Sequence, residues 1–117
     1  DENMLPALAI GTKASIGSTY NYVAPLYHAL IDAFNNGDLP QAQILQQQSI
    51  DMIRLLGKYG GIATGKAYMK LIGLDCGSFR LPVKNMDAAA FEQFKKDVAL
   101  LGFDQYSSKI PTATNAL

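Results

Sequence analysis

Two clusters of polar side chains in the first twenty residues have the types and spacing to contact a hydroxylated ligand. Asp1 and Glu2 are adjacent carboxylates that directly precede a short apolar segment. They therefore lie near the positive N-terminal end of a predicted helix, and their oxygens accept hydrogen bonds, which suits polyol recognition. Gly17, Ser18 and Thr19 end a small, uncharged segment, so a strand over that segment would carry hydroxyls at its tip.

Other motifs favour structural roles. Residues 60–66 fit the phosphate-loop spacing G-x-x-x-x-G-K, but position 67 is alanine and the segment follows a predicted helix rather than a strand. A glycine-rich turn between helices is the favoured interpretation. His28 is the only histidine and Cys76 the only cysteine, so the sequence supports neither a structural zinc site nor an internal disulfide. We expect no metal site.

Hydrophobic periodicity predicts a mainly α chain with one β-strand. Apolar residues recur at helical spacing, and capping residues and glycines separate the segments. Helices are predicted over residues 3–10, 22–34, 38–56, 62–72 and 87–101.

The predicted 38–56 helix illustrates the pattern. Asp38 is a good N-cap for it, and an apolar seam with Ser49 in it runs along one side. The glutamines, Gln46 among them, are expected to cover the opposite, outward side.

Residues 14–19 are too small and too few for a helix, and they favour a buried strand of the parallel type. A lone strand presents a physical problem, because each buried backbone group without a hydrogen-bond partner costs about 1–3 kcal/mol. Either the segment is not a strand, or its partners lie in residues or chains outside these 117.

Composition excludes several classes of protein. Lysine plus arginine equals aspartate plus glutamate at 10 each, so no charge excess supports a nucleic-acid-binding module. No apolar run approaches the ~20 residues of a membrane span. A hydrophobic share of 49% in 117 residues fits one globular domain, and a single free thiol fits a reducing compartment.

The first 21 residues combine Asp-Glu at 1–2, a short helix, and then Gly-Thr-Lys-Ala-Ser-Ile-Gly-Ser-Thr-Tyr-Asn at 11–21. In this they resemble the N-acetylneuraminate (sialic acid) lyases. These enzymes belong to the dihydrodipicolinate synthase/N-acetylneuraminate lyase superfamily of class I aldolases. The likeness continues through 36–38, 60–70 and 80–82 and weakens after Met86. The run at 16–21 is its most specific part, since dihydrodipicolinate synthases usually end this strand differently.

The resemblance implies the C-terminal part of a (β/α)8 TIM barrel. Residues 1–36 would be the end of the barrel, with helix 7, strand 8 at about 14–19 and helix 8. Residues 37–106 would form an extension of three extra helices. The low apolar content after Tyr106 separately predicts a mobile tail, over 107–117. The neighbours of the lone strand, strands 1 and 7, would then belong to the missing N-terminal part of the barrel, which is the first partner that the resemblance implies.

The resemblance also implies a reaction. The family cleaves sialic acid to pyruvate and N-acetylmannosamine without a cofactor, through a Schiff base on a lysine, with a tyrosine assisting proton transfer. Lys13, Lys66 and Lys70 do not match the Schiff-base position, and the tyrosine position is also outside the chain. We therefore expect no catalytic residue in this chain, and no activity from it alone.

The positions that match are substrate contacts. Asp1 and Glu2 match the acidic pair that hydrogen-bonds the hydroxylated tail of the sugar, and Ser18 matches a serine at the end of strand 8. Gly17 would let the substrate approach the backbone. We expect Asp1, Glu2 and Ser18 to lie in one small region, with sialic acid or a related 2-keto sugar acid as ligand. By family analogy the intact protein is a cytoplasmic homotetramer, with no nucleic-acid or membrane partner.

Two alternatives remain open. The first is another 2-keto acid aldolase of the ketodeoxygluconate or dihydrodipicolinate type, against which the Asp1-Glu2 pair argues because a small aldehyde needs no polyol acceptors. The second is a non-catalytic helical interaction module. Such a module would be monomeric and well folded in isolation, whereas a barrel fragment would expose apolar surface and sediment in a concentration-dependent way.

Overall fold

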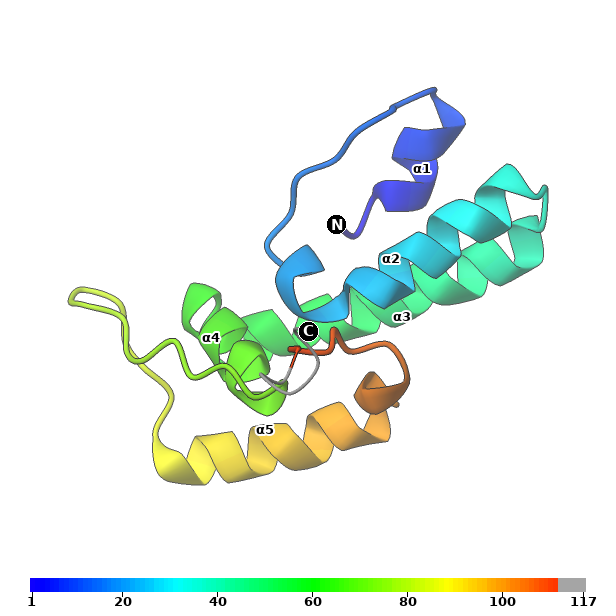
Figure 1. The fold of residues 1–117 in the computed structure, drawn as a ribbon. Helices are drawn as coiled ribbons and strands as arrows, with labels where there is room; N and C mark the ends of the chain where they lie inside the picture. Colours follow the sequence, from blue (N-terminus) through cyan, green and yellow to red (C-terminus); the bar gives the residue numbers. More distant parts are fainter. Residues whose placement is uncertain (112–117) are drawn as a thin grey trace.

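Helices dominate the computed structural model, which describes residues 1–111 (Figure 1). Five α-helices and a short 3-10 turn, η1, follow one another along these 111 residues. The predicted helices are confirmed, with ends that differ by a few residues. Their bounds are α1 Met4–Ala9, α2 Tyr20–Asn35, α3 Leu39–Lys58, α4 Ile62–Leu71, α5 Ala88–Leu100 and η1 Phe103–Gln105.

Helices α2 and α3 form the central antiparallel pair (Figure 1). The connection between them is only three residues long, so the chain reverses direction at once. Leu26 and Leu30 of α2 and Leu45 of α3 are almost fully buried in the core that the pair shares. The apolar stripes that the periodicity predicted are therefore what join the two helices.

Stacked and edge-on aromatic rings attach α4 and α5 to this pair. The rings of Tyr22 and Tyr68 stack with centroids 4.5 Å apart, and Phe94 meets Tyr68 edge-on at 4.8 Å. Phe103 of η1 lies 5.3 Å from the same Tyr68 ring. Burial and ring geometry of this kind make aromatic clusters strong contributors to a small core.

The first turn of α2 is kinked. Val23 has φ −133°, outside the helical region, and Pro25 two residues later has no N–H to donate. Ser108 partners the groups at the kink: its Oγ accepts from the Ala24 N–H at 3.3 Å, and its own N–H donates to the Tyr22 carbonyl at 2.8 Å. Ser108, in the predicted mobile tail, therefore contacts α2, and residues 112–117 lie outside the described part.

The predicted strand over 14–19 does not form, and among residues 1–111 the structure contains no strand. Residues 12–17 instead run from α1 to α2 as an open segment, in which the Ile16 side chain is fully exposed. The physical reason is that no segment within the described chain lies beside residues 14–19 to hydrogen-bond with their backbone.

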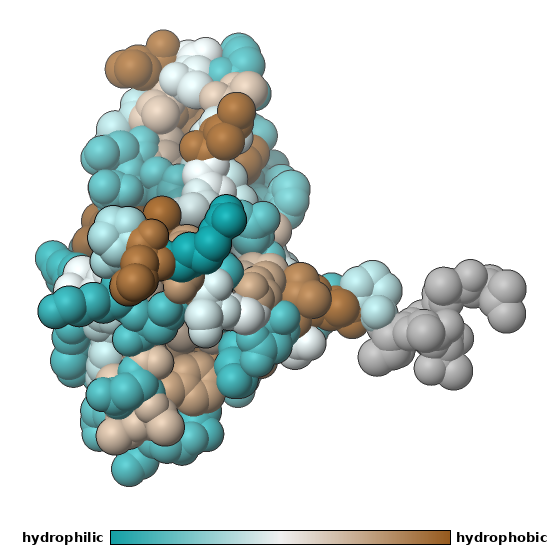
Figure 2. All heavy atoms as spheres, turned by 90° about the vertical axis from the view of Figure 1, so that its left-hand side faces the viewer, coloured by the Kyte–Doolittle hydropathy of each residue, from teal (hydrophilic) through white to brown (hydrophobic). Residues whose placement is uncertain are grey.

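Apolar side chains reach the surface at several separate places. Figure 2 shows them as brown atoms among mostly hydrophilic neighbours on one face of the molecule. Five side chains are at least two-thirds exposed: Ile10, Ile16, Ile62, Leu81 and Leu100. No helix in the described range has the length and apolarity that crossing a bilayer requires.

Candidate functional site: the Asp1 carboxylate and the 17–19 segment

The Asp1 carboxylate lies against the segment that precedes α2. Its Oδ2 accepts two hydrogen bonds from Thr19, one from the backbone N–H at 3.1 Å and one from the hydroxyl at 2.6 Å. The Asp1 side chain is 12% exposed, so the carboxylate is held in a largely enclosed position. The structure therefore brings together two polar clusters that are sixteen to eighteen positions apart in the sequence.

Gly17 makes this approach possible. A Cβ atom added at Gly17 would stand 1.7 Å from Asp1 Oδ1 and 2.4 Å from the carboxylate carbon. No side chain fits there unless the carboxylate leaves Thr19. Gly17 thus lets the Asp1 carboxylate approach the backbone at the position where the resemblance implied an approach by substrate.

A buried hydrogen-bond chain continues from Thr19 into the core. The Thr19 hydroxyl lies 2.6 Å from the Tyr27 hydroxyl, which in turn lies 2.7 Å from Ser49 Oγ on α3. A carboxylate only accepts, so the single Thr19 hydroxyl proton points to Asp1. Tyr27 must then donate to Thr19, and Ser49 to Tyr27.

Tyr27 can serve as a donor because its hydroxyl remains protonated. Burial raises the pKa of Tyr27, while hydrogen bonds with Ser49 and Thr19 act in the opposite direction and are outweighed. Its ring also packs edge-on against Tyr20 with centroids 4.5 Å apart. The phenol is thereby fixed in position and in protonation state.

Gln46 of α3 holds the backbone around the acidic pair. Its side-chain oxygen accepts from the Leu5 N–H at 2.8 Å, and its side-chain nitrogen donates to the Asp1 carbonyl at 3.4 Å. The expectation that Gln46 faces outward is therefore wrong: this residue is only 7% exposed. The docking of α1 onto α3 overrides the glutamine-rich pattern.

Glu2 and Ser18 border different cavities. The Glu2 side chain is 56% exposed, and a hydrogen bond from its own backbone lowers the pKa of its carboxyl. It lines a cavity of 480 Å³ between α1 and α3. Ser18, also exposed, lines another of 320 Å³ with Tyr22 and Ile62 among its walls. Of the predicted site residues, Asp1 and Gly17 are thus in direct contact, and Ser18 lies between Gly17 and Thr19.

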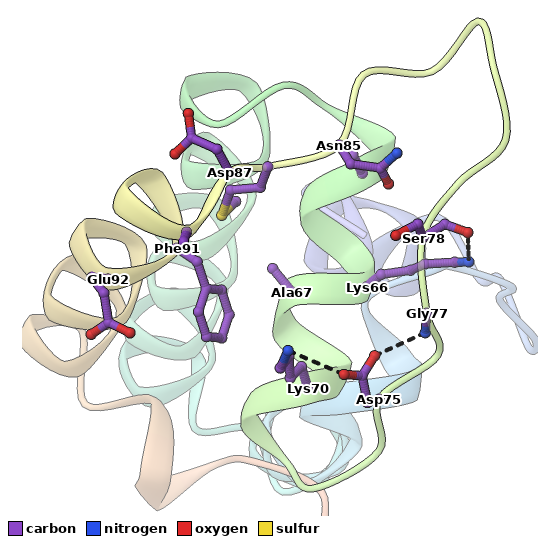
Figure 3. A pocket seen from close by; sticks show the side chains of 13 residues that line it. Lys66, Ala67, Lys70, Asp75, Gly77, Ser78, Asn85, Asp87, Phe91 and Glu92 are labelled. Carbon is purple, nitrogen blue, oxygen red and sulfur yellow. Dashed lines mark hydrogen bonds and ion pairs between the residues drawn. The ribbon is translucent and has the colours of Figure 1, made fainter.

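A third cavity, of 410 Å³, opens between α4, the loop after it and the start of α5 (Figure 3). The Lys66 ammonium donates to the carbonyls of Cys76 and Ser78 at 3.0 and 3.1 Å, and Lys70 pairs with Asp75 at 3.1 Å. Lys66 therefore anchors a loop. Of the motif at 60–66, Gly60 and Gly61 form the turn after α3 and Lys66 lies within α4, in agreement with a glycine-rich turn between helices rather than a phosphate loop after a strand.

Within residues 1–111, no group of three histidine, cysteine, aspartate or glutamate side chains converges as a metal site would require. His28 and Cys76 are both exposed. Around Asp1 the described residues offer a carboxylate that accepts hydrogen bonds, hydroxyls that donate and accept them, and the Gln46 side-chain amide.

Sequence reasoning missed the residues that hold Asp1 in place. Ser49 carried a usable signal, because a hydroxyl inside an apolar helical seam needs a buried partner. Tyr27 carried a weaker signal of the same kind. Nothing in the local pattern marked Gln46 as buried.

Comparison with known proteins shows which family the chain belongs to. The model of the dihydrodipicolinate synthetase family matches residues 1–101. The chain belongs to this family. A curated member, the N-acetylneuraminate lyase of Lactiplantibacillus plantarum, is 40% identical over 100 residues, which are 82% of this chain and 34% of the relative.

Both branches of the family are similar to this chain. The 4-hydroxy-tetrahydrodipicolinate synthase 1 of Streptomyces coelicolor is 34% identical over 89 residues, 74% of this chain and 29% of that protein. The solved structure of Proteus mirabilis N-acetylneuraminate lyase superposes with a TM-score of 0.84 at 39% identity, covering 88% of this chain and 35% of the other. The chain therefore spans about a third of the length of the relatives it matches.

Proposed function

We propose that this chain is the C-terminal portion of a class I aldolase that cleaves sialic acid to pyruvate and N-acetylmannosamine. The observation that carries the proposal is the Asp1 carboxylate, fixed by two hydrogen bonds from Thr19 over a glycine that no other residue could replace without moving it. The similarity to two N-acetylneuraminate lyases, at 40% and 39% identity, supports the same activity.

In this proposal the chain binds the hydroxylated tail of the sugar. Asp1 and Glu2 accept hydrogen bonds from its hydroxyls and Ser18 contacts the substrate, while Gly17 makes room for the Asp1 carboxylate beside them. The rest of the barrel supplies the lysine that forms the Schiff base and the tyrosine that assists proton transfer. Carbon–carbon cleavage then needs both portions, so the 117 residues alone are inactive.

The open segment before α2 supports a missing barrel partner. Residues 12–17 form no strand within the described chain, and Ile16 in their middle is fully exposed. We propose that the N-terminal portion of the barrel pairs with this segment on both sides and converts it into the eighth strand. Residues 1–36 would then complete the barrel, and residues 37–106 would pack outside it.

A second candidate function is condensation of pyruvate with a small aldehyde. The 34% identity to the Streptomyces coelicolor synthase favours it. The paired carboxylates argue against it, because one is fixed by Thr19 and the other is exposed, an arrangement that offers acceptors a small aldehyde would not use.

A chimeric enzyme tests the proposal. Residues 1–117 replace the matching third of the Lactiplantibacillus plantarum lyase, so that the host supplies the lysine and the tyrosine. The matched control carries the corresponding third of the Streptomyces coelicolor synthase instead. We expect the first chimera to release pyruvate from sialic acid and the control to release little, while borohydride traps pyruvate on both.

Two results would contradict this proposal. The first is that the chimera carrying residues 1–117 traps pyruvate but does not cleave sialic acid. Its lysine would then be functional, while residues 1–117 would not bind the sugar tail. Pyruvate release by the isolated 117-residue chain, above a heat-treated sample, would contradict the proposal that catalysis needs the other portion.

A further inference from the structure

The buried hydrogen-bond chain behind Asp1 is the polar feature that the proposed function leaves unused. We propose that Thr19, Tyr27 and Ser49 form a positioning relay that fixes the Asp1 carboxylate, so that α2 and α3 set the position of Asp1. This inference rests on the proposed function, and it assigns roles to residues that contact no substrate themselves.

The first step is the difference in the surroundings of the two Asp1 carboxylate oxygens. Oδ2 receives both hydrogen bonds from Thr19, whereas in the described part of the chain no hydrogen bond reaches Oδ1. Oδ1 is also the atom nearest the Cβ position of Gly17, at 1.7 Å. The relay therefore anchors Oδ2, while Oδ1 packs over Gly17 without a hydrogen-bond partner among the described residues.

The second step is the direction of the relay. Each hydroxyl donates toward Asp1, from Ser49 to Tyr27 to Thr19, over contacts of 2.7, 2.6 and 2.6 Å. Hydrogen bonds aligned in this way polarise one another, and an ionised acceptor at the end strengthens them. Ser49 and Thr19 are both buried, so water does not compete for the bonds.

Helix α3 reaches Asp1 by two separate routes. Gln46 and Ser49 are three residues apart on α3 and so lie on one face of the helix. Gln46 contacts the Asp1 backbone directly, and Ser49 reaches the Asp1 side chain through two hydroxyls. A helix of the proposed extension thus determines both the main-chain and the side-chain position of a substrate-binding residue.

The test uses the chimera with Thr19→Val, Tyr27→Phe and Ser49→Ala. We expect the KM for sialic acid to rise about tenfold for Thr19→Val and about threefold for Tyr27→Phe, with a smaller rise for Ser49→Ala, because lost hydrogen bonds to charged groups cost more than neutral ones. The kcat and the borohydride trapping of pyruvate, which does not involve the sugar tail, should change less than twofold. Thr19→Ser restores the hydroxyl and should restore the KM.

Tyr68→Phe is the matched control. It also removes a buried tyrosine hydroxyl from this core, one that donates to the Met52 carbonyl at 3.0 Å rather than toward Asp1. Equal KM effects from Tyr68→Phe and Tyr27→Phe would overturn the relay, because both would then act through stability. Unchanged KM in Thr19→Val, or trapping that falls in parallel with KM, would overturn it as well.

A second measurement separates this inference from the proposed function. A parent chimera that traps pyruvate without cleaving sialic acid contradicts the function, and the relay is then read from NMR spectra of the 117-residue chain. We expect the Thr19 amide resonance to follow the ionisation of Asp1, to lose that dependence in Asp1→Asn, and to shift in Tyr27→Phe but not in Tyr68→Phe. If the Thr19 amide resonance is the same in Asp1→Asn as in the parent chain, the relay is overturned, whichever reaction the enzyme catalyses.

Discussion

Single atoms decide the geometry of the candidate site. Asp1 and the 17–19 segment meet because one glycine lacks a side chain and one threonine offers two donors. From the sequence, Asp1, Gly17 and Ser18 could be identified as candidate site residues. Their mutual contact was not, since it depends on the path of residues 12–17 around α1.

Gly17→Ala should displace the Asp1 carboxylate. The new Cβ would overlap Oδ1, so the carboxylate must rotate away and give up its hydrogen bonds to Thr19, at a cost of about 1–3 kcal/mol in unfolding free energy. Urea unfolding of the 117-residue chain measures this. Gly57→Ala is the control: nothing lies within 4 Å of its added Cβ in α3, so it should leave stability unchanged or raise it by up to about 1 kcal/mol. Equal stabilities for the two variants would contradict the close approach.

Asp97 should make the chain sensitive to acid. Hydrogen bonds from Lys58, Tyr59 and Gln93 lower the pKa of Asp97 to about 2. A lowered folded-state pKa stabilises the fold above the unfolded value, near ~4, and that stability is lost as the pH falls from about 4 towards 2. Unfolding midpoints across this range should fall for the natural chain and more gently for Asp97→Asn. The same slope in both would show that Asp97 does not carry the effect.

At the scale of elements, helical periodicity predicted each of the five helices in residues 1–111, because each buries one apolar stripe. It could not find the state of residues 14–19, because a strand exists only with neighbours to pair with, and the described chain has none. It also missed the kink at Val23, whose freed groups are satisfied by Ser108, far along the sequence. Long-range partners, rather than local preference, decided each of these differences.

The start of α3 should depend on its cap. The Asp38 side chain accepts from the Gln41 N–H at 3.1 Å, as its place in the sequence predicted. Asp38→Ala removes that acceptor and should cost about 0.5–2 kcal/mol, whereas Asp38→Asn keeps an acceptor and should cost less. Thermal unfolding followed by circular dichroism measures both. An alanine variant as stable as the asparagine variant would contradict the role of the cap.

At the scale of the whole molecule, the chain has a core of its own and yet carries surface that its own helices do not cover. Tyr22, Tyr68 and Phe94 centre the core, while Ile10 and Ile16 lie exposed around the open segment. This combination agrees with the proposal that the chain is about a third of a barrel enzyme, since one part is packed and another lacks its neighbours.

The exposed apolar side chains should make the isolated chain associate. Burial of such side chains between copies is favourable, so the sedimentation coefficient should rise with protein concentration. Ile16→Ser combined with Ile10→Ser should reduce the effect, and Leu100→Ser on α5 tests whether it is confined to the open segment. A single monomeric species at every concentration would instead favour the self-contained helical module.

The most direct test of the central claim is the sugar-tail recognition by the acidic pair. In the chimera with the Lactiplantibacillus plantarum host, Asp1→Asn with Glu2→Gln should lower kcat/KM for sialic acid by at least about tenfold, because charged acceptors of the tail hydroxyls are lost. Borohydride trapping of pyruvate, which involves only the host lysine, should remain unchanged. Undiminished cleavage of sialic acid by the double variant would contradict the account.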